Sequence, residues 1–215
     1  MLEQSAKCVF IDIRHKDESW LKERFPSIWS HLEKIGINMA NDLIPVVPAA
    51  HYAIGGVAVD LNGQTSLARL YAVGETACTG VHGANRLAST SLLECLVWGH
   101  LAGKQAGSTK TQLGFPEFKP WRYESGDIDP ALVAQDWQTL RNIMWNYVGL
   151  VRTPHRLARA EKMLRELLLE VEEFYKKATL SDSIMGLRHG IQTALAVTLS
   201  AAKAKVSRGC HYLVK

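Results

Sequence analysis

The sequence predicts an α+β chain in which a glycine-rich part with short strands is followed by a purely helical part. Glycines and short apolar runs dominate 41–106, whereas apolar residues recur at helical spacing across 131–206. Between them, 107–130 is polar and rich in Gly and Pro, which is typical of a linker. Because short links join the helical patterns, we expect an antiparallel three-helix bundle at the carboxy-terminal end.

The first forty residues mix a strand with short helices. Val9–Ile13 is an apolar run that predicts a strand, and Asp17 or Ser19 is suited to cap a following helix. A second helix is expected to begin at Pro26 and to end at Gly36. Its apolar positions at helical spacing are Ile28, Leu32 and Ile35.

The glycine-rich part predicts a hairpin and then a helix. Val57–Asp60 and Leu67–Ala72 have strand composition, and Asn62-Gly63 between them tolerates the positive φ of a tight turn. After Gly83 the pattern becomes helical and continues to about Gln105. The apolar side of this helix comprises Leu92, Leu93, Leu96, Val97 and Leu101.

The helical part carries clear start signals. Thr153-Pro154 combines an N-cap residue with proline at the first helical position, and a last helix is predicted over about Ile184–Val206. The first stripe of apolar residues comprises Leu132, Val133, Trp137, Leu140, Met144 and Tyr147. These stripes predict core packing rather than a cofactor site.

Composition excludes several classes of protein. The chain of 215 residues has a net charge of +4 and no Lys/Arg cluster interleaved with aromatics, so we expect no nucleic-acid partner. It has no apolar run near the roughly 20 residues that a membrane span requires. The four cysteines lack metal-site spacing, so no metal site is expected. Cys8 and Cys95, in apolar surroundings, are predicted to be reduced core residues of a cytoplasmic protein.

The residues with chemical potential lie close together in 45–95. Glu75 follows Gly74 after an apolar strand, where a carboxylate suits ligand hydroxyls, although an acid in a turn is an equally good interpretation. Ser89 and Ser91 are candidate caps of the helix that follows, and its amino-terminal N–H groups would favour an anionic group. A merely well-capped helix is the alternative.

His51 and Arg86 suggest a site for a dicarboxylate. Arg offers a planar pair of donors for one carboxylate, and His supplies another donor near neutral pH. Each residue alone is more often structural, but both accompany glycines that allow close backbone approach. Together they favour a binding role.

These residues resemble a known family. The segment 45–99, PVVPAAHYAIGGVAVDLNGQTSLARLYAVGETACTGVHGANRLASTSLLECLVWG, resembles the second half of the flavin site of L-aspartate oxidases, within the succinate dehydrogenase and fumarate reductase flavoproteins. RFPSIWSHLEKIGIN resembles the end of that family's capping domain. WNYVGLVRTPHRLARAE and SRGCHY resemble its helical carboxy-terminal domain. The resemblance covers nearly the whole chain.

The resemblance implies a role for each matching residue. FAD would be the cofactor, with Glu75 at its ribityl portion and Ser91 and Leu92 meeting the flavin at the helix end. His51, Arg86 and Ser89 would bind the carboxylates of L-aspartate, the substrate oxidised to iminoaspartate in NAD biosynthesis. Quinolinate synthase would be a possible partner.

The resemblance also implies a domain map. It assigns 1–44 to the end of the capping domain, 45–110 to the carboxy-terminal segment of the FAD-binding α/β domain, 111–130 to a linker and 131–215 to the helical domain. The family's GxGxxG motif and its catalytic arginine have no counterpart in this sequence. We therefore expect no catalytic base in this chain, and we expect activity only when it is joined to an amino-terminal flavin-binding half, supplied either by a further stretch of the same gene product or by a separate chain. Because the strands of 41–110 would join a flavin-domain core that other sequence supplies, we also expect 41–110 alone to expose apolar surface and to associate.

Two alternatives remain open. A succinate dehydrogenase or fumarate reductase fragment is less favoured, because PAAHY and SLLECLVWG are more similar to the L-aspartate oxidase pattern. A non-catalytic remnant that acts in assembly through its helical bundle is the third hypothesis.

Overall fold

The computed structural model describes residues 8–109, 114, 116–120, 126 and 128–214. The chain divides into two compact units, 1–53 and 54–215. Six α-helices and short strands make up the described part, so the α+β prediction is confirmed. Part of the predicted linker 111–130 lies outside the described residues.

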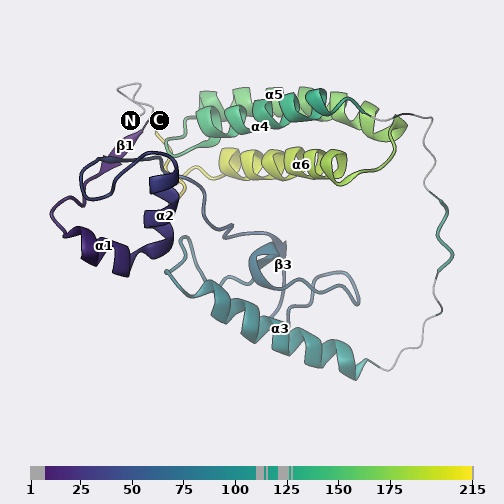
Figure 1. Cartoon of the computed structure of the whole chain (residues 1–215). Helices are drawn as coiled ribbons and strands as arrows, with labels where there is room; N and C mark the ends of the chain where they lie inside the picture. The colour runs from purple at the N-terminus through teal and green to yellow at the C-terminus, as the bar shows by residue number, and fades with distance from the viewer. Residues whose placement is uncertain (1–7, 110–113, 115, 121–125, 127, 215) are drawn as a thin grey trace. The chain divides into compact units, whose positions relative to one another are not determined.

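The first unit consists of two strands and two helices (Figure 1). Strand β1 (Val9–Ile11) pairs antiparallel with β2 (Ile44–Val46), and Phe10 stands opposite Pro45. Helices α1 (Glu18–Arg24) and α2 (Pro26–Lys34) lie between them in sequence. The predicted strand and helix starts are therefore confirmed, although β1 is two residues shorter than predicted.

The core of this unit selects a different face of α2 from the one that the spacing suggested. Trp29 and Leu32 are buried on α2, whereas Ile28 and Ile35 are 53% and 59% exposed. The reason is that Trp29 and Leu32 pack into one cluster of buried residues with Leu21. Helical spacing fixes which residues share a face, but the neighbouring helix decides which face is covered.

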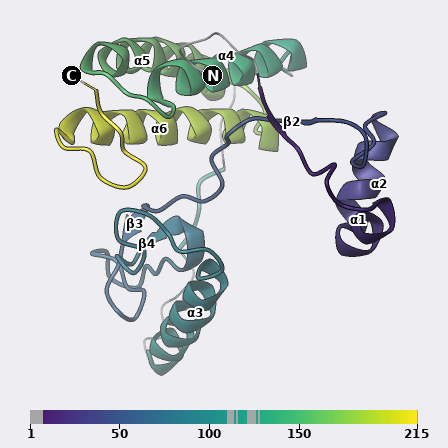
Figure 2. The same cartoon turned by 90° about the vertical axis from the view of Figure 1, so that its left-hand side faces the viewer.

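The strands of the second unit pair differently from the prediction. Strand β3 (Val57–Ala58) pairs in parallel with β4 (Ala77–Cys78), directly after the 3-10 helix η1 (Gly74–Thr76), and Figure 2 shows β3 and β4 together. The expected hairpin between Val57–Asp60 and Leu67–Ala72 is therefore wrong.

The Asn62-Gly63 turn does form, but hydrogen bonds to the nearby Asp60 carboxylate hold it, and it does not join the two predicted strands. The Asp60 carboxylate accepts hydrogen bonds from the backbone N–H groups of Asn62 and Gln64, at 2.8 and 2.9 Å. Gly63 has a φ of +75°, as predicted for this turn. The predicted second strand is reduced to an isolated bridge between Gln64 and Tyr71, because side chains and local turns satisfy its backbone groups.

Helix α3 (Ser91–Ser108) carries an unusual distribution of apolar residues. Leu92, Leu93 and Leu96 are 73%, 60% and 69% exposed. The helix buries Glu94 and Ala102 instead. The prediction that this region exposes apolar surface is confirmed.

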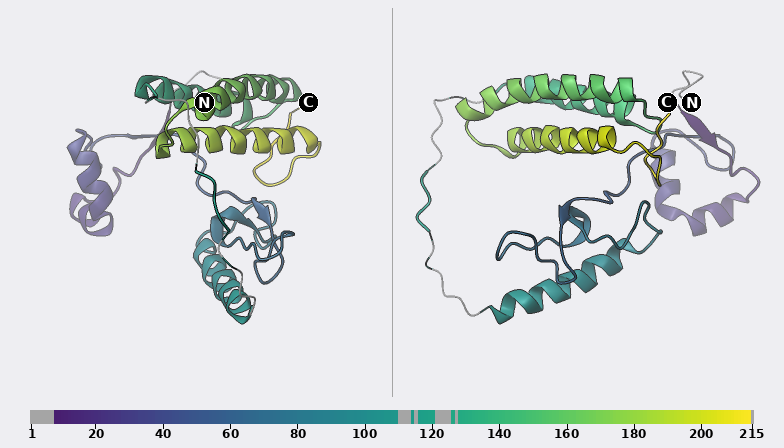
Figure 3. Two further views of the ribbon diagram at one scale, coloured as in Figure 1. Left: turned by 90° about the vertical axis from the view of Figure 1, so that its right-hand side faces the viewer. Right: turned by 180° about the vertical axis from the view of Figure 1, so that it is seen from behind.

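Helices α4 (Pro130–Val148), α5 (Pro154–Lys177) and α6 (Asp182–Lys203) run side by side (Figures 1 and 3). They share one apolar core, and their short links make neighbours antiparallel. Thr153 caps α5 as predicted, since its side chain accepts a hydrogen bond from the Arg156 N–H. The bundle prediction is confirmed, and α6 begins and ends slightly earlier than predicted.

The cysteines are free, but they are not core residues. Cys8 is half-buried and Cys95 is exposed, which corrects the expectation that both are buried. Cys95 lies on α3 among the leucines that the described chain leaves uncovered, so apolar neighbours in sequence did not produce burial.

No helix within the described ranges is both long and apolar enough to cross a bilayer.

Leu164 tests whether the bundle has a cooperative core. It is fully buried on α5, whereas Leu169 on the same helix is 69% exposed. We predict that Leu164→Ala lowers the free energy of unfolding by about 2–5 kcal/mol, because it leaves a cavity. Leu169→Ala is the matched control and should change it by less than about 0.5 kcal/mol. Denaturant titrations followed by circular dichroism measure both, and equal effects would contradict the observed core.

Candidate functional site

The candidate site is built on the loop that joins β4 to α3. Gly80 and Gly83 take positive φ angles of +79° and +55°, which allow the chain to fold back tightly before the helix begins. The helix starts at Ser91, close to the candidate caps Ser89 and Ser91 and later than Gly83, after which the sequence pattern becomes helical. The residues before it therefore form a loop that presents side chains at the helix end.

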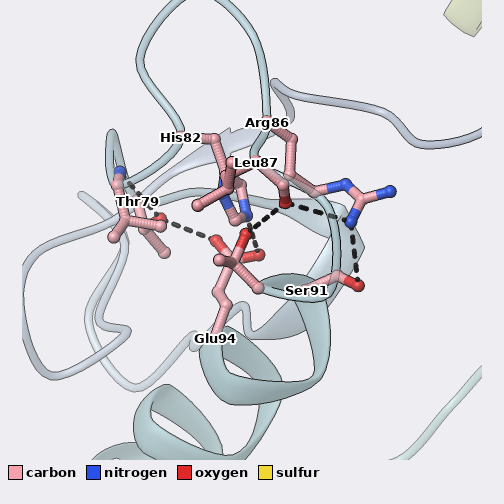
Figure 4. A network of polar contacts seen from close by, with 8 residues as sticks. Thr79, His82, Arg86, Leu87, Ser91 and Glu94 are labelled. Atoms are coloured by element: carbon pink, nitrogen blue, oxygen red, sulfur yellow. Dashed lines mark hydrogen bonds and ion pairs between the residues drawn. The ribbon is translucent and has the colours of Figure 1, made fainter.

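A buried carboxylate holds this loop to α3 (Figure 4). The Thr79 hydroxyl donates to Glu94 Oε1 at 2.6 Å, and His82 Nε2 lies 2.8 Å from Glu94 Oε2. The Glu94 side chain is 2% exposed and that of His82 is 7% exposed. Figure 4 shows Thr79 and His82 approaching Glu94 from the loop.

The arrangement satisfies the chemistry of a buried acid. A carboxylate in an apolar environment is costly unless donors surround it. The Thr79 hydroxyl and the His82 ring each supply a donor, with the His82 proton assigned to Nε2 when the imidazole is neutral. Across the described residues, every buried side-chain nitrogen or oxygen has a hydrogen-bond partner. Glu94 and its donors Thr79 and His82 therefore form a polar network that attaches the loop to α3, and we refer to it as the anchor.

Arg86 lies beside the amino-terminal end of α3. Its Nη1 is 3.4 Å from the Leu87 carbonyl oxygen and 3.5 Å from Ser91 Oγ, both long contacts to groups at the helix start. The guanidinium and the helix end place positive charge in one region. This combination suits an anionic ligand.

The helix end itself corrects the predicted caps. Thr90, rather than Ser89 or Ser91, is the N-cap residue of α3. Its hydroxyl donates to the Leu87 carbonyl at 2.7 Å, so the Thr90 side chain makes no capping hydrogen bond to the helix. The first-turn N–H groups are therefore not satisfied by a cap, as an anion-binding helix end requires.

Three predicted residues surround this helix end in different ways. Ser89 is exposed and has a φ of +69°, a strained conformation for a residue that is not glycine. Ser91 is half-buried at the first position of α3. Leu92 is 73% exposed. The structure thus brings Arg86 and Ser91 together at one end of α3, and Ser89 lies two residues before the helix begins.

Glu75 and His51 lie elsewhere. Glu75 is exposed in η1, immediately after Gly74, which has a φ of +71°. A Cβ on Gly74 would come within 3.1 Å of Cys95 Sγ, so this turn approaches α3 closely. His51 is exposed in the first unit, whereas Arg86 belongs to the second, and their pairing stays a prediction.

A hollow of about 460 Å³ opens beside the buried anchor. Its lining combines loop residues with the α3 surface, including His82, Asn85, Leu93, Glu94 and Trp98. The hollow is largely apolar, so it extends the uncovered face of α3.

Thr79, His82 and Glu94 lie within recognisable sequence motifs, but the sequence alone predicted no role for them. The available signal was Glu94 itself, because one acid within the apolar run Leu92–Trp98 must either face solvent or find buried donors. Its donors lie 12 and 15 residues earlier in a loop, a separation that helical spacing does not reveal.

Comparisons with known proteins match two family models and several curated relatives. The FAD binding domain family matches residues 1–92, and the fumarate reductase flavoprotein C-term family matches residues 137–214. The chain is 40% identical to L-aspartate oxidase of Yersinia pestis, over 99% of this chain and 40% of that protein. It is also 40% identical to L-aspartate oxidase of Pyrococcus horikoshii, over 99% of this chain and 39% of that protein. The chain thus spans about 40% of the length of these curated relatives.

Solved structures of fumarate reductases have a similar fold. A quinol-fumarate reductase with menaquinol molecules superimposes with a TM-score of 0.80 at 31% identity, covering 97% of this chain and 39% of that chain. The quinol fumarate reductase of E. coli superimposes with a TM-score of 0.72 at 30% identity and the same coverage.

Removing the buried carboxylate tests the anchor. We predict that Glu94→Ala accelerates amide hydrogen exchange in the peptide from Thr79 to Thr90, because the donors of Thr79 and His82 lose their shared acceptor. Mass spectrometry of the full chain measures this exchange.

Two variants sharpen this test. Glu94→Gln keeps the shape and one acceptor, so its effect should be intermediate. Lys104→Ala, at an exposed position of the same helix, is the control and should leave the peptide unchanged. Unaltered exchange in Glu94→Ala would contradict an anchoring role.

Proposed function

We propose that this chain, which belongs to the succinate dehydrogenase and fumarate reductase flavoprotein family, forms the carboxy-terminal part of an FAD-dependent L-aspartate oxidase. The observation that carries the proposal is the convergence of Arg86 with the amino-terminal end of α3. About 40% identity to L-aspartate oxidases over nearly the whole chain supports the choice of substrate.

The described residues fit FAD. A helix end whose N–H groups lack a side-chain cap suits the negative charge of a reduced flavin. The positive φ of Gly74 and its close approach to Cys95 bring the Glu75 turn next to the same helix. In this proposal, Glu75 binds the ribityl portion of the cofactor, and Ser91 and Leu92 meet the flavin.

The chain's own residues would bind and orient the substrate. Arg86 offers a planar pair of donors to one carboxylate of L-aspartate, and Ser89 and His51 add hydrogen bonds. FAD, when bound, would supply a two-electron oxidation in which the substrate loses a hydride from Cα and a proton from its amino group, which leaves iminoaspartate. The proposal assigns no catalytic base to this chain, so the proton-handling group comes from elsewhere.

A partner of flavin-domain type is part of the proposal. The exposed side chains of Leu92, Leu93 and Leu96 form an apolar face that an α/β flavin domain would cover. The curated relatives are more than twice as long as this chain, and the flavin-binding half is proposed to come either from a further stretch of the same gene product or from a separate chain. The proposed domains are 1–44, 45–110, 111–130 and 131–215, as the sequence indicated. The proposal extends to a cytoplasmic location and to quinolinate synthase as a possible partner.

The related dicarboxylate oxidoreductases are the second candidate. The similarity in fold to quinol fumarate reductases, at 30% and 31% identity, favours it. The complete enzyme separates the two by turnover. Oxidation of L-aspartate supports the first proposal, and activity on succinate alone would favour the second. A non-catalytic remnant would turn over neither.

Flavin retention tests whether the chain is sufficient. We predict that the purified chain, incubated with FAD and desalted, shows no flavin absorption, because the dinucleotide-binding glycine motif has no counterpart here. Addition of the amino-terminal half of a related L-aspartate oxidase should restore a spectrum that bleaches with L-aspartate. Retained flavin that bleaches in the chain alone would contradict the need for a partner.

Arg86 tests the substrate site. In the complemented enzyme, we predict that Arg86→Ala raises the activation free energy derived from kcat/KM by about 2–5 kcal/mol, because a substrate carboxylate loses a charged partner.

Two further variants accompany Arg86→Ala. Arg86→Lys should recover part of the loss, since it restores the charge without the planar donor pair. Arg69→Ala, at an exposed position of the same unit, should have no comparable effect. Full activity of Arg86→Ala would favour the remnant hypothesis.

A further inference from the structure

The segment after α6 folds into a tight turn over Ser207–His211. The Arg208 N–H donates to the His211 carbonyl and the His211 N–H donates to the Arg208 carbonyl, both at 2.9 Å. Gly209 takes a φ of +51° at the tip, where Cys210 follows it. This pattern is a two-residue hairpin turn, which has a defined shape because both ends are hydrogen-bonded.

The base of the turn is fixed to the helical bundle. Arg152 Nη1 lies 3.0 Å from His211 Nδ1, and His211 Nε2 lies 3.0 Å from the Ala204 carbonyl oxygen. Because arginine can only donate, Nδ1 accepts and Nε2 carries the proton. Arg152 Nε in turn donates to the carbonyl oxygens of Val148 and Gly149, at 3.1 and 3.2 Å.

The backbone adds to this attachment. The Arg152 N–H donates to the Tyr212 carbonyl at 3.0 Å, and the Val214 N–H donates to the Arg152 carbonyl at 2.8 Å. Burial holds the pKa of Arg152 below its ordinary value, which is consistent with a turn packed close to the guanidinium. The link between α4 and α5 therefore holds the turn in one orientation.

The tip of the turn contacts the loop that carries Arg86. A Cβ on Gly209 would overlap the backbone carbonyl of Ala84, so the two backbones are in close contact. The Cys210 thiol donates to Asn85 Oδ1 at 3.3 Å. Ala84 and Asn85 directly precede Arg86, and both segments belong to the unit 54–215.

The loop is thus held at its start and near its middle. Glu94 fixes its start through Thr79 and His82, and the turn contacts it at Ala84 and Asn85. We propose that the Ser207–His211 turn is a positioning element for Arg86, through which the helical carboxy-terminal part sets the substrate-binding geometry. This inference rests on the proposed function for the role of Arg86.

A disulfide cross-link tests the contact without any activity. The variant Asn85→Cys, in a background where the other three cysteines are serine, should form a disulfide with Cys210 under mild oxidation. Peptide mapping by mass spectrometry of the full chain detects it. Ser108→Cys, at the other end of α3, is the control and should not cross-link. A cross-link at Asn85 no more frequent than the control would overturn the proposal.

The variant Gly209→Ala tests the positioning role. Its added methyl group has no room against Ala84, so the loop must shift. In the complemented enzyme we expect KM for L-aspartate to rise by about 10- to 100-fold, with a much smaller change in kcat and unchanged flavin content. Gly107→Ala, whose Cβ meets nothing within 4 Å, is the matched control. An unchanged KM in Gly209→Ala would overturn the role.

Cys210→Ala keeps the inference testable if Gly209→Ala fails to fold. It removes only the thiol contact and should raise KM in the same direction by a smaller factor, whereas an unchanged KM would count against the role. If the complemented enzyme does not oxidise L-aspartate, the proposed function fails. The cross-link then still decides whether the turn and the loop are in contact.

Discussion

The buried carboxylate of Glu94 is the interaction on which the candidate site depends. At 2% exposure it requires donors, and the loop between β4 and α3 provides them through Thr79 and His82. These hydrogen bonds fix the loop against the first turns of α3. Arg86 lies between the anchored residues and the helix start, so its position beside Ser91 follows from the same constraint.

The anchor also determines how α3 is oriented. Since Glu94 must face the loop, the leucines at positions 92, 93 and 96 face outward. Helix α3 buries its acid and exposes its leucines, which is the reverse of the burial pattern of a helix that packs on its own domain. This inversion is understandable if another domain covers the apolar face, as the proposed flavin-domain partner would.

The helical bundle differs from α3 in how its apolar residues are covered. Leucines such as Leu157 and Leu164 are buried within α4, α5 and α6 themselves, so this part has its own core. Its link to the site is polar and local, through Arg152 and His211 at the base of the final turn. A self-supporting bundle is a rigid base from which such a turn can hold a loop in place.

The sequence by itself determined the features that depend on local chemistry. Thr153-Pro154 fixed the start of α5, and Gly63 adopted the positive φ that its turn requires, because capping and backbone sterics act within a few residues. The proximity of Arg86 to Ser91 could also be predicted from the sequence, since both residues lie in one short motif. Only the tertiary structure decided that β3 pairs with Ala77–Cys78 and that Glu94 is buried. Both outcomes depend on which distant segment supplies hydrogen-bond partners, and sequence periodicity carries no information about that choice.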